Sequence, residues 1–192
     1  MERRRAWIAV VVCGLALSPS LRAQVRVGLQ ASAQTSDSLS VQINSGSGLS
    51  ISSLTPGAVN SFSGGPVSVT TSWTLKGNSK AVELYAYFDS ATSALVHANS
   101  QNTTDIPSAA VKVCMNGTGG YNPLSSATPF SGSASGLLLF SQSITGTNKN
   151  SSRTDTIALQ LDLSVPANGQ DMTQLPADTY TGTLRIQAQA TP

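Results

Sequence analysis

Catalysis requires titratable side chains that converge, and this sequence offers few candidates. His97 is its only histidine, which excludes zinc sites that take two or three histidines from one chain. It could serve a hydrolytic triad with Asp89 or Asp105. No Gly-x-Ser-x-Gly nucleophile motif accompanies it, because residues 132–136 read Gly-Ser-Ala-Ser-Gly, with Ala134 at the central position. We therefore predict a protein that is not an enzyme and has no catalytic, cofactor-binding or metal-binding residues.

Tyrosines are better candidates for binding chemistry. If the alternating segment 82–88 is a strand with Val82, Leu84, Ala86 and Phe88 toward the core, Tyr85 and Tyr87 face outward, about 7 Å apart. A tyrosine ring offers a flat apolar body with a polar tip, which suits a glycan or a protein ligand. Tyr121 lies in a Gly- and Ser-rich stretch nearby in the sequence and joins them as a candidate surface-binding residue. The alternative is that the second sheet or a loop covers the two rings.

The N-terminus has the layout of a secretory signal peptide. Residues 1–5, which include three arginines, precede an apolar run, residues 6–17, and a short segment that ends in the small residue Ala23. The apolar run is shorter than the roughly 20 residues that a membrane-spanning helix needs. We predict cleavage between Ala23 and Gln24, no retained membrane span, and a secreted, periplasmic or cell-surface location.

The charge limits the classes of partner, and the cysteine content limits the sources of stability. The leader would carry four arginines and one glutamate, so its removal lowers the formal charge from +2 to −1. This leaves no basis for predicting nucleic-acid binding. Cys114 is then the only cysteine, so an intrachain disulfide is impossible. Stability must come from burial and strand pairing.

The elements that position these residues are short strands. Apolar and polar residues alternate with period two over 67–75, 156–165 and 180–190, and more weakly over 39–43, 49–51, 82–88, 111–115 and 137–143. Strands with one apolar face must bury it against a second sheet. We predict an all-β, immunoglobulin-like antiparallel sandwich of about seven to nine strands, forming one domain over residues 24–192, with long loops near 116–136 and 145–155.

One segment carries a family resemblance. Leu175-Pro176-Ala177-Asp178-Thr179-Tyr180-Thr181-Gly182-Thr183-Leu184 leads into a final alternating strand. It resembles the closing segment of spore-coat-U-like and chaperone–usher pilin-type subunits, mainly over residues 175–190. The resemblance implies a sandwich that is completed by a strand from a neighbouring subunit, and an export chaperone as a further partner.

The first residues after the leader also alternate. Val25, Val27 and Leu29 share one face, so they read either as the first strand of the chain's own sandwich or, by the resemblance, as a donor strand that fills a neighbour's groove. We predict an exported structural or adhesive surface subunit that self-assembles by N-terminal strand donation. The alternative is a secreted monomeric binding module that recognises a glycan or protein through exposed tyrosines and a long loop.

Overall fold

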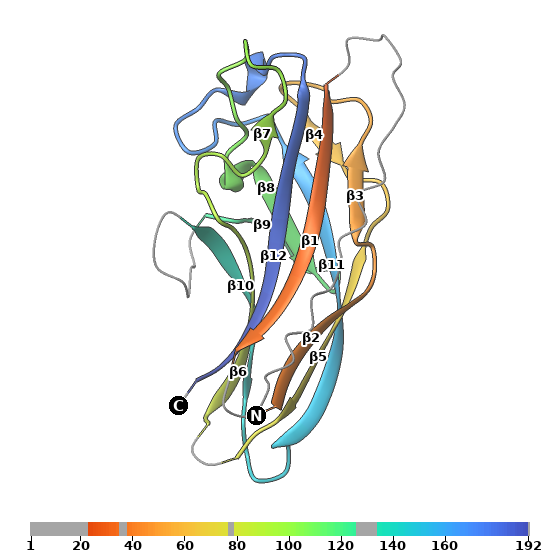
Figure 1. The fold of residues 1–192 in the computed structure, drawn as a ribbon, viewed down its shortest axis with the longest axis vertical. Helices are drawn as coiled ribbons and strands as arrows, with labels where there is room; N and C mark the ends of the chain where they lie inside the picture. Colours follow the sequence, from red (N-terminus) through yellow and green to blue (C-terminus); the bar gives the residue numbers. More distant parts are fainter. Residues whose placement is uncertain (1–22, 35–37, 77–78, 126–133, 192) are drawn as a thin grey trace, which may run out of the picture.

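The computed structural model describes residues 23–34, 38–76, 79–125 and 134–191. Of the predicted leader, only Ala23 falls within these ranges. The described residues form two β-sheets of six strands each, packed face to face (Figure 1). Two 3₁₀ helices, Ser108–Ala110 and Met172–Gln174, interrupt the connections. The prediction of an all-β sandwich is confirmed.

The first sheet has the strand order β10-β6-β12-β1-β3, and β7 adds to β12 beside this path. Its strands are β10 (Ser135–Ser143), β6 (Ala81–Phe88), β12 (Thr179–Thr191), β1 (Gln24–Gln34), β3 (Gly48–Ile51) and β7 (Val96–His97). The second sheet has the order β2-β5-β11-β8-β9, and β4 adds to β11. Its strands are β2 (Ser38–Ser45), β5 (Val67–Thr74), β11 (Asn150–Asp162), β8 (Val111–Met115), β9 (Thr118–Pro123) and β4 (Val59–Ser61).

Alternate side chains of these strands fill the space between the sheets, as the sequence pattern predicts. Ile157, Leu184 and Ile186 are fully buried, and Leu159 keeps only 8% of its surface exposed. Val165 departs from the pattern, with 46% of its surface exposed. The reason is that β11 ends at Asp162, so the alternation of the preceding residues no longer applies.

Both predicted long loops are wrong over part of their length. Within 116–136, residues 118–123 form β9, which pairs with β8; all six of its residues are exposed, so no apolar alternation marks it in the sequence. Part of that stretch, 126–133, lies outside the described residues. Within 145–155, β11 already begins at Asn150 and pairs with Thr74 of β5. The first residues of β11 are polar on both faces, so a hydropathy pattern does not reveal this part of the strand.

The strand count and the pairing also differ from the prediction. The described residues contain twelve strands, and five of them, β3, β4, β7, β8 and β9, are only two to six residues long. The sheets are not purely antiparallel, since β1 runs parallel to β12 from Gln24↔Thr179 to Gln34↔Gln189. Figure 1 shows these two strands side by side along the length of the sandwich. The first and last strands of the described chain are therefore neighbours.

The chain crosses from one sheet to the other between β2 and β3. Gly46 lies at this crossing with a φ of +79°, in the left-handed region that favours glycine. A Cβ atom at Gly46 would lie 2.9 Å from the Cα of Val67, so the close approach to β5 also requires glycine. This crossing places β2 in the second sheet and β3 beside β1 in the first.

Candidate functional site

The candidate site is the seat of the N-terminal strand, defined as the position of β1 between β12 and β3. Val25 and Val27 point into the core with 0% and 2% of their surface exposed, and Leu29 packs against the core while half-buried. Arg26 and Gly28 face outward. The three residues predicted to fill a groove do share the inward face, and here they fill the sandwich of their own chain. Burial of each valine stabilises this arrangement by about 1.5–3 kcal/mol.

Backbone pairing of β1 is stronger at its beginning than at its end. From Val25 to Gly28 the strand is paired on both sides, with β12 and with β3. Within the described residues, the part from Leu29 to Gln34 is paired only with β12. The last residues of β1, next to the connection over 35–37, therefore have one open edge.

Two backbone hydrogen bonds hold the start of β1. The amide of Gln24 donates to the carbonyl oxygen of Asp178 at 2.8 Å, and the amide of Leu54 donates to the carbonyl of Ala23 at 3.0 Å. Ala23 keeps only 7% of its surface exposed. Thus the structure places the predicted cleavage junction, Ala23 and Gln24, at the start of a paired strand.

Arg185 ties the middle of β1 to its neighbours. It lies directly opposite Gln30 in the parallel ladder and donates to the side-chain oxygen of Gln30. The same guanidinium donates to the carboxylate of Asp89 at 2.7 Å. Because Asp89 is 62% exposed, this ion pair adds little stability, and its main effect is to orient Arg185 over β1.

Asp178 organises the loop that leads into β12. Its carboxylate accepts hydrogen bonds from the amide of Asn99 at 3.1 Å, the side chain of Asn102 at 2.9 Å and the amide of Thr179 at 2.7 Å. Burial by itself raises the pKa of Asp178, but these hydrogen bonds outweigh it and hold the pKa below its ordinary range. The loop therefore presents the Asp178 carbonyl to Gln24 in a fixed position.

Tyr180 anchors the same loop from inside the core. Its ring is fully buried, and its hydroxyl accepts from Asn102 at 3.0 Å and donates to the carbonyl of Pro176 at 2.9 Å. These residues belong to the segment that carries the sequence resemblance. Their role in this structure is to fix the first residues of β12, against which β1 lies.

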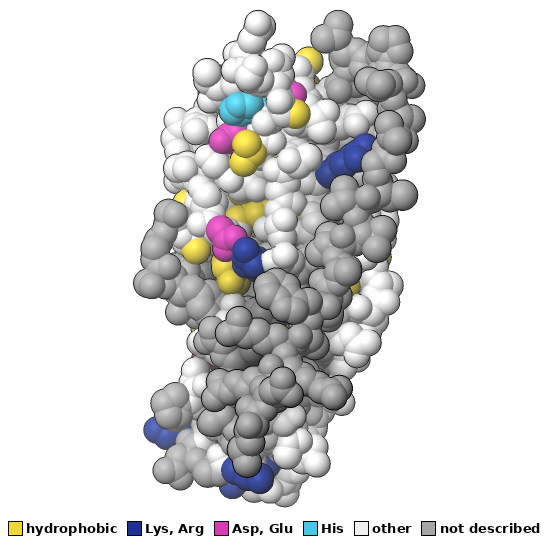
Figure 2. Space-filling view, in the orientation of Figure 1, with side chains coloured by type: hydrophobic (Ala, Val, Ile, Leu, Met, Phe, Trp, Pro, Cys, Tyr) yellow, Lys and Arg dark blue, Asp and Glu magenta, His cyan; other side chains and the backbone are white. Residues whose placement is uncertain are grey.

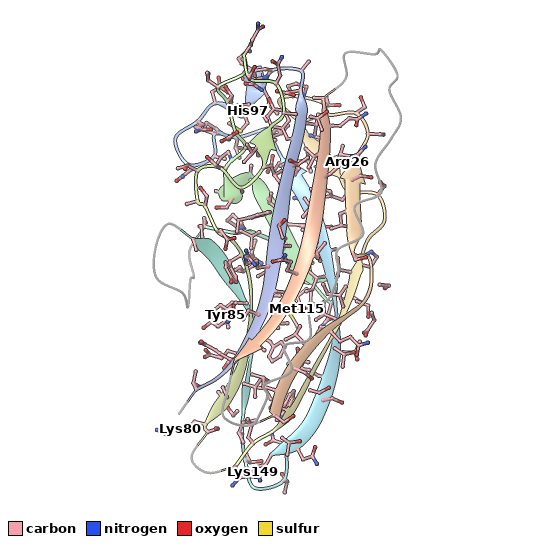
Figure 3. The ribbon with its side chains drawn as sticks, in the orientation of Figure 1. Arg26, Lys80, Tyr85, His97, Met115 and Lys149 are labelled. Atoms are coloured by element: carbon pink, nitrogen blue, oxygen red, sulfur yellow. The ribbon has the colours of Figure 1, made fainter. Side chains whose placement is uncertain are left out.

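His97 forms no hydrolytic site with the described residues. Its Nδ1 lies 2.6 Å from Asp105, and Asp105 also accepts hydrogen bonds from the His97 amide and from Ser93. In a triad the serine contacts the histidine, whereas here it contacts the acid. Asp89, the other acid considered, is bound to Arg185 instead. The His97–Asp105 pair joins two parts of a loop at one end of the sandwich. Lys80 and Lys149 lie at the other end (Figure 3).

The candidate tyrosines are not an open binding surface. Tyr85 and Tyr87 lie on the outer side of β6 as predicted, but the prediction that they are exposed is wrong, since only 9% and 8% of their surface is accessible. The Tyr85 hydroxyl donates to Glu83 and the Tyr87 hydroxyl to Gln187. Burial raises the pKa of both phenols. The residues opposite them on the adjacent strand β12 are Gln187 and Arg185, and the pattern within a single strand cannot reveal such neighbours.

Tyr121 is exposed over 43% of its surface and stands on β9, in the sheet opposite Tyr85 and Tyr87. The three tyrosines therefore do not form one site, and a binding role for Tyr121 alone stays a prediction. No helix among the described residues has the length and apolar character needed to cross a bilayer.

Comparison with models of known protein families finds no family that matches the chain, and no curated protein sequence matches it. The candidate site is therefore interpreted from its geometry.

Proposed function

We propose that the protein is an exported structural or adhesive subunit of a cell surface, and that copies assemble by passing β1 from one copy into the next. One observation carries this proposal: a strand at the end of the described fold occupies an inner position of its sheet, between β12 and β3. A strand in that position is held on both sides, and after the predicted cleavage its covalent link to the rest of the fold runs through residues 35–37 to β2.

Exchange between copies would keep every contact of the seat. If β1 of one copy enters the seat of another in the same orientation, Val25 and Val27 fill the same space and the ladder with β12 keeps its register. Such an exchange of identical elements is a low-cost route to association. When each copy donates in one direction and accepts from the other, the contact is heterologous and produces a filament.

Self-insertion competes with this exchange. A strand attached to its own seat has a high effective concentration there, so it enters in cis unless something holds it away. An export chaperone that covers the seat until another copy arrives would remove this competition. We therefore expect such a chaperone as the second partner, which agrees with the sequence resemblance.

The surface of the described residues suits close association of copies. Charged residues make up 10% of the sequence, and on the face shown in Figure 2 they are few and scattered. Like-charge repulsion between copies is therefore small. This supports a structural subunit over a protein that steers a charged ligand.

A pair of cysteines tests the exchange. Gly28 on β1 and Gly48 on β3 are directly opposite each other in the antiparallel ladder, and a Cβ at either position would have no contact closer than 3.6 Å. Such a pair satisfies the Cα separation of a disulfide. The chain with Gly28→Cys, Gly48→Cys and Cys114→Ser is exported, assembled under reducing conditions and then oxidised.

A covalent ladder on a non-reducing gel is the expected result, because each disulfide then joins two copies. A single internally bridged monomer in material that is assembled by electron microscopy would overturn strand exchange. Absence of any assembly, with or without the chaperone fraction, would overturn the subunit function itself. Cell fractionation with N-terminal sequencing tests export, and Gln24 is the expected first residue.

A further inference from the structure

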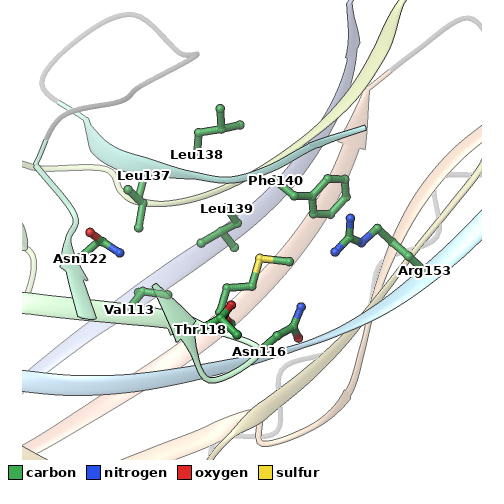
Figure 4. Close-up of a pocket in the computed structure, with 10 residues that line it drawn as sticks. Val113, Asn116, Thr118, Asn122, Leu137, Leu138, Leu139, Phe140 and Arg153 are labelled. Carbon is green, nitrogen blue, oxygen red and sulfur yellow. The ribbon is translucent and has the colours of Figure 1, made fainter. Parts of the chain in front are cut away.

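An elongated cleft of about 320 Å³ opens between β10 in one sheet and the β8–β9 hairpin in the other (Figure 4). This volume is at the lower end of the range for small-molecule sites, about 300–1,000 Å³. The cleft is separate from the seat of β1, since neither β1, β12 nor β3 contributes a lining residue. Its lining combines apolar side chains of β10 and β8 with polar residues of the β8–β9 hairpin and Arg153.

A β-bulge produces the apolar wall. The pairing of β10 with β6 shifts between Leu138 and Phe140, which leaves Leu139 as an extra residue. Because a bulge re-aims side chains, Leu137, Leu139 and Phe140 can all line the cleft. Met115 on β8, in the other sheet, also lines the cleft. The result is a slot with an apolar wall on its β10 side rather than a flat edge.

Arg153 marks one end of the slot. Its guanidinium lies over the ring of Phe140, 4.1 Å from the centroid, and donates through Nε and Nη2 to Asp155 at 2.7 and 2.6 Å. Asp155 is only 2% exposed and also accepts from Asn116 at 2.8 Å. Its oxygens are therefore satisfied by three donors. Among the described residues, none accepts a hydrogen bond from the remaining nitrogen, Nη1.

A buried hydroxyl lies close to Arg153 in the neighbouring strand. Thr71 on β5 is directly opposite Arg153 in the ladder with β11, so both side chains face the space between the sheets. Thr71 is fully buried, and its hydroxyl has no hydrogen-bond partner among the described residues. Of these two residues, Arg153 lines the cleft and keeps one nitrogen available to it.

We propose that the cleft binds a medium-chain aliphatic carboxylate, with its chain between Met115 and the β10 leucines and its carboxylate at Nη1 of Arg153. The charge of the site selects this occupant: among the described residues that line the cleft the charged one is Arg153, and a guanidinium pairs with carboxylates. Arg153 keeps 31% of its side-chain surface exposed beside the buried Asp155, so its guanidinium stays accessible from the cleft.

Titration calorimetry on the purified exported protein tests the proposal with hexanoate, octanoate and decanoate, each below its micellar concentration. Affinity is expected to rise about fourfold for each methylene that enters the slot. Decanol and decylamine have the same chain with a different head group. Decanoate is expected to bind at least about tenfold more tightly than either.

Two variants locate the site. Leu138→Trp at the mouth of the cleft is expected to reduce decanoate affinity at least about tenfold, whereas Val165→Trp, at an exposed position outside the cleft, leaves it unchanged. Arg153→Lys keeps the cation beside Asp155 but removes the forked donor. It is expected to abolish the preference for decanoate over decanol while decanol binding persists.

Three results would overturn the proposal: no binding of any carboxylate, equal binding of decanoate and decanol, or equal effects of the two tryptophan variants. If Leu138→Trp does not fold, backbone NMR shifts of the unmodified protein decide. Decanoate must then perturb Arg153, Met115 and Leu139, and shifts confined to other residues would contradict the assignment.

Discussion

Gly28 and Gly48 stand directly opposite each other in the last pair of the ladder between β1 and β3. Before this pair β1 has a partner on each side, and after it β1 has only β12 among the described strands. The pair therefore marks the point where the hold on β1 weakens. A strand that opens from its seat is expected to fray from the end nearer residues 35–37 first.

Val27→Asp is expected to prevent β1 from occupying its position between β12 and β3. Val27 is 2% exposed and faces the core, so an aspartate there buries a carboxylate without a partner and destabilises the fold by about 3–5 kcal/mol. The control is Arg26→Asp, one residue earlier on the outward face, where the effect stays within about 0.5 kcal/mol. Urea unfolding measures both. Equal effects would mean that β1 is not inserted as described.

Gly182→Ala is expected to disturb β12 by steric overlap. A Cβ atom at Gly182 would lie 2.1 Å from the carbonyl oxygen of Ala94, and that backbone has little freedom to move. The expected loss of stability is about 1–3 kcal/mol or more. Gly28→Ala, whose Cβ would have only ordinary contacts, is the matched control in the same denaturation experiment. A neutral Gly182→Ala would contradict the close packing of the loop on β12.

Tyr180→Phe removes a buried hydroxyl that makes two hydrogen bonds. Asn102 and the carbonyl of Pro176 lose their partner, and the expected cost is about 1–3 kcal/mol. Tyr121→Phe, at a tyrosine that is 43% exposed, is expected to change stability by less than about 0.5 kcal/mol. Thermal melts compare the two, and a difference near zero would show that the loop before β12 is not held by Tyr180.

Asp162 is expected to make the stability of the fold depend on pH in the acid range. Burial raises its pKa, but Lys112 at 2.5 Å and Ser164 outweigh this and lower the pKa to about 2. A carboxyl with a lowered pKa stabilises the fold above its ordinary pKa, near 4, and this contribution disappears as the pH falls to about 2. It amounts to at most about 2 kcal/mol.

The measurement is the stability of Asp162→Asn relative to the unmodified protein between pH 5 and pH 2. The unmodified protein is expected to be the more stable at pH 5, with the difference shrinking to near zero at about pH 2. Asp89→Asn, at a carboxylate that is 62% exposed, is the control. A difference that is the same at both pH values would mean that the Lys112–Asp162 pair does not form.

Much of the sandwich could be predicted from the sequence because apolar alternation is a local property. Val67, Val69 and Trp73 share a buried face, and so do Tyr180, Leu184 and Ile186. The predictions fail where local alternation is weak, or where a neighbouring strand determines whether a side chain is exposed. β9 is entirely exposed, and Tyr85 and Tyr87 are buried on a strand that pairs with one about 100 residues away.

The inward face of β1 was also predictable, since Val25, Val27 and Leu29 alternate with polar residues. Which strands hold β1 was not, because pairing with β12 joins residues more than 150 positions apart. The Arg153–Asp155 pair was missed for a similar reason. It lies in a polar stretch that the sequence pattern assigns to a loop, and only its pairing with β5 turns it toward the core.

Mixing two single-cysteine chains tests strand exchange most directly. One chain carries Gly28→Cys, the other Gly48→Cys, and both carry Cys114→Ser, so a disulfide between the two forms readily only if β1 of the first chain lies in the seat of the second. The account predicts a covalent heterodimer after joint assembly and oxidation, well above the background given by a Gly146→Cys partner. A heterodimer yield no greater than that background, in material that has assembled, would contradict it.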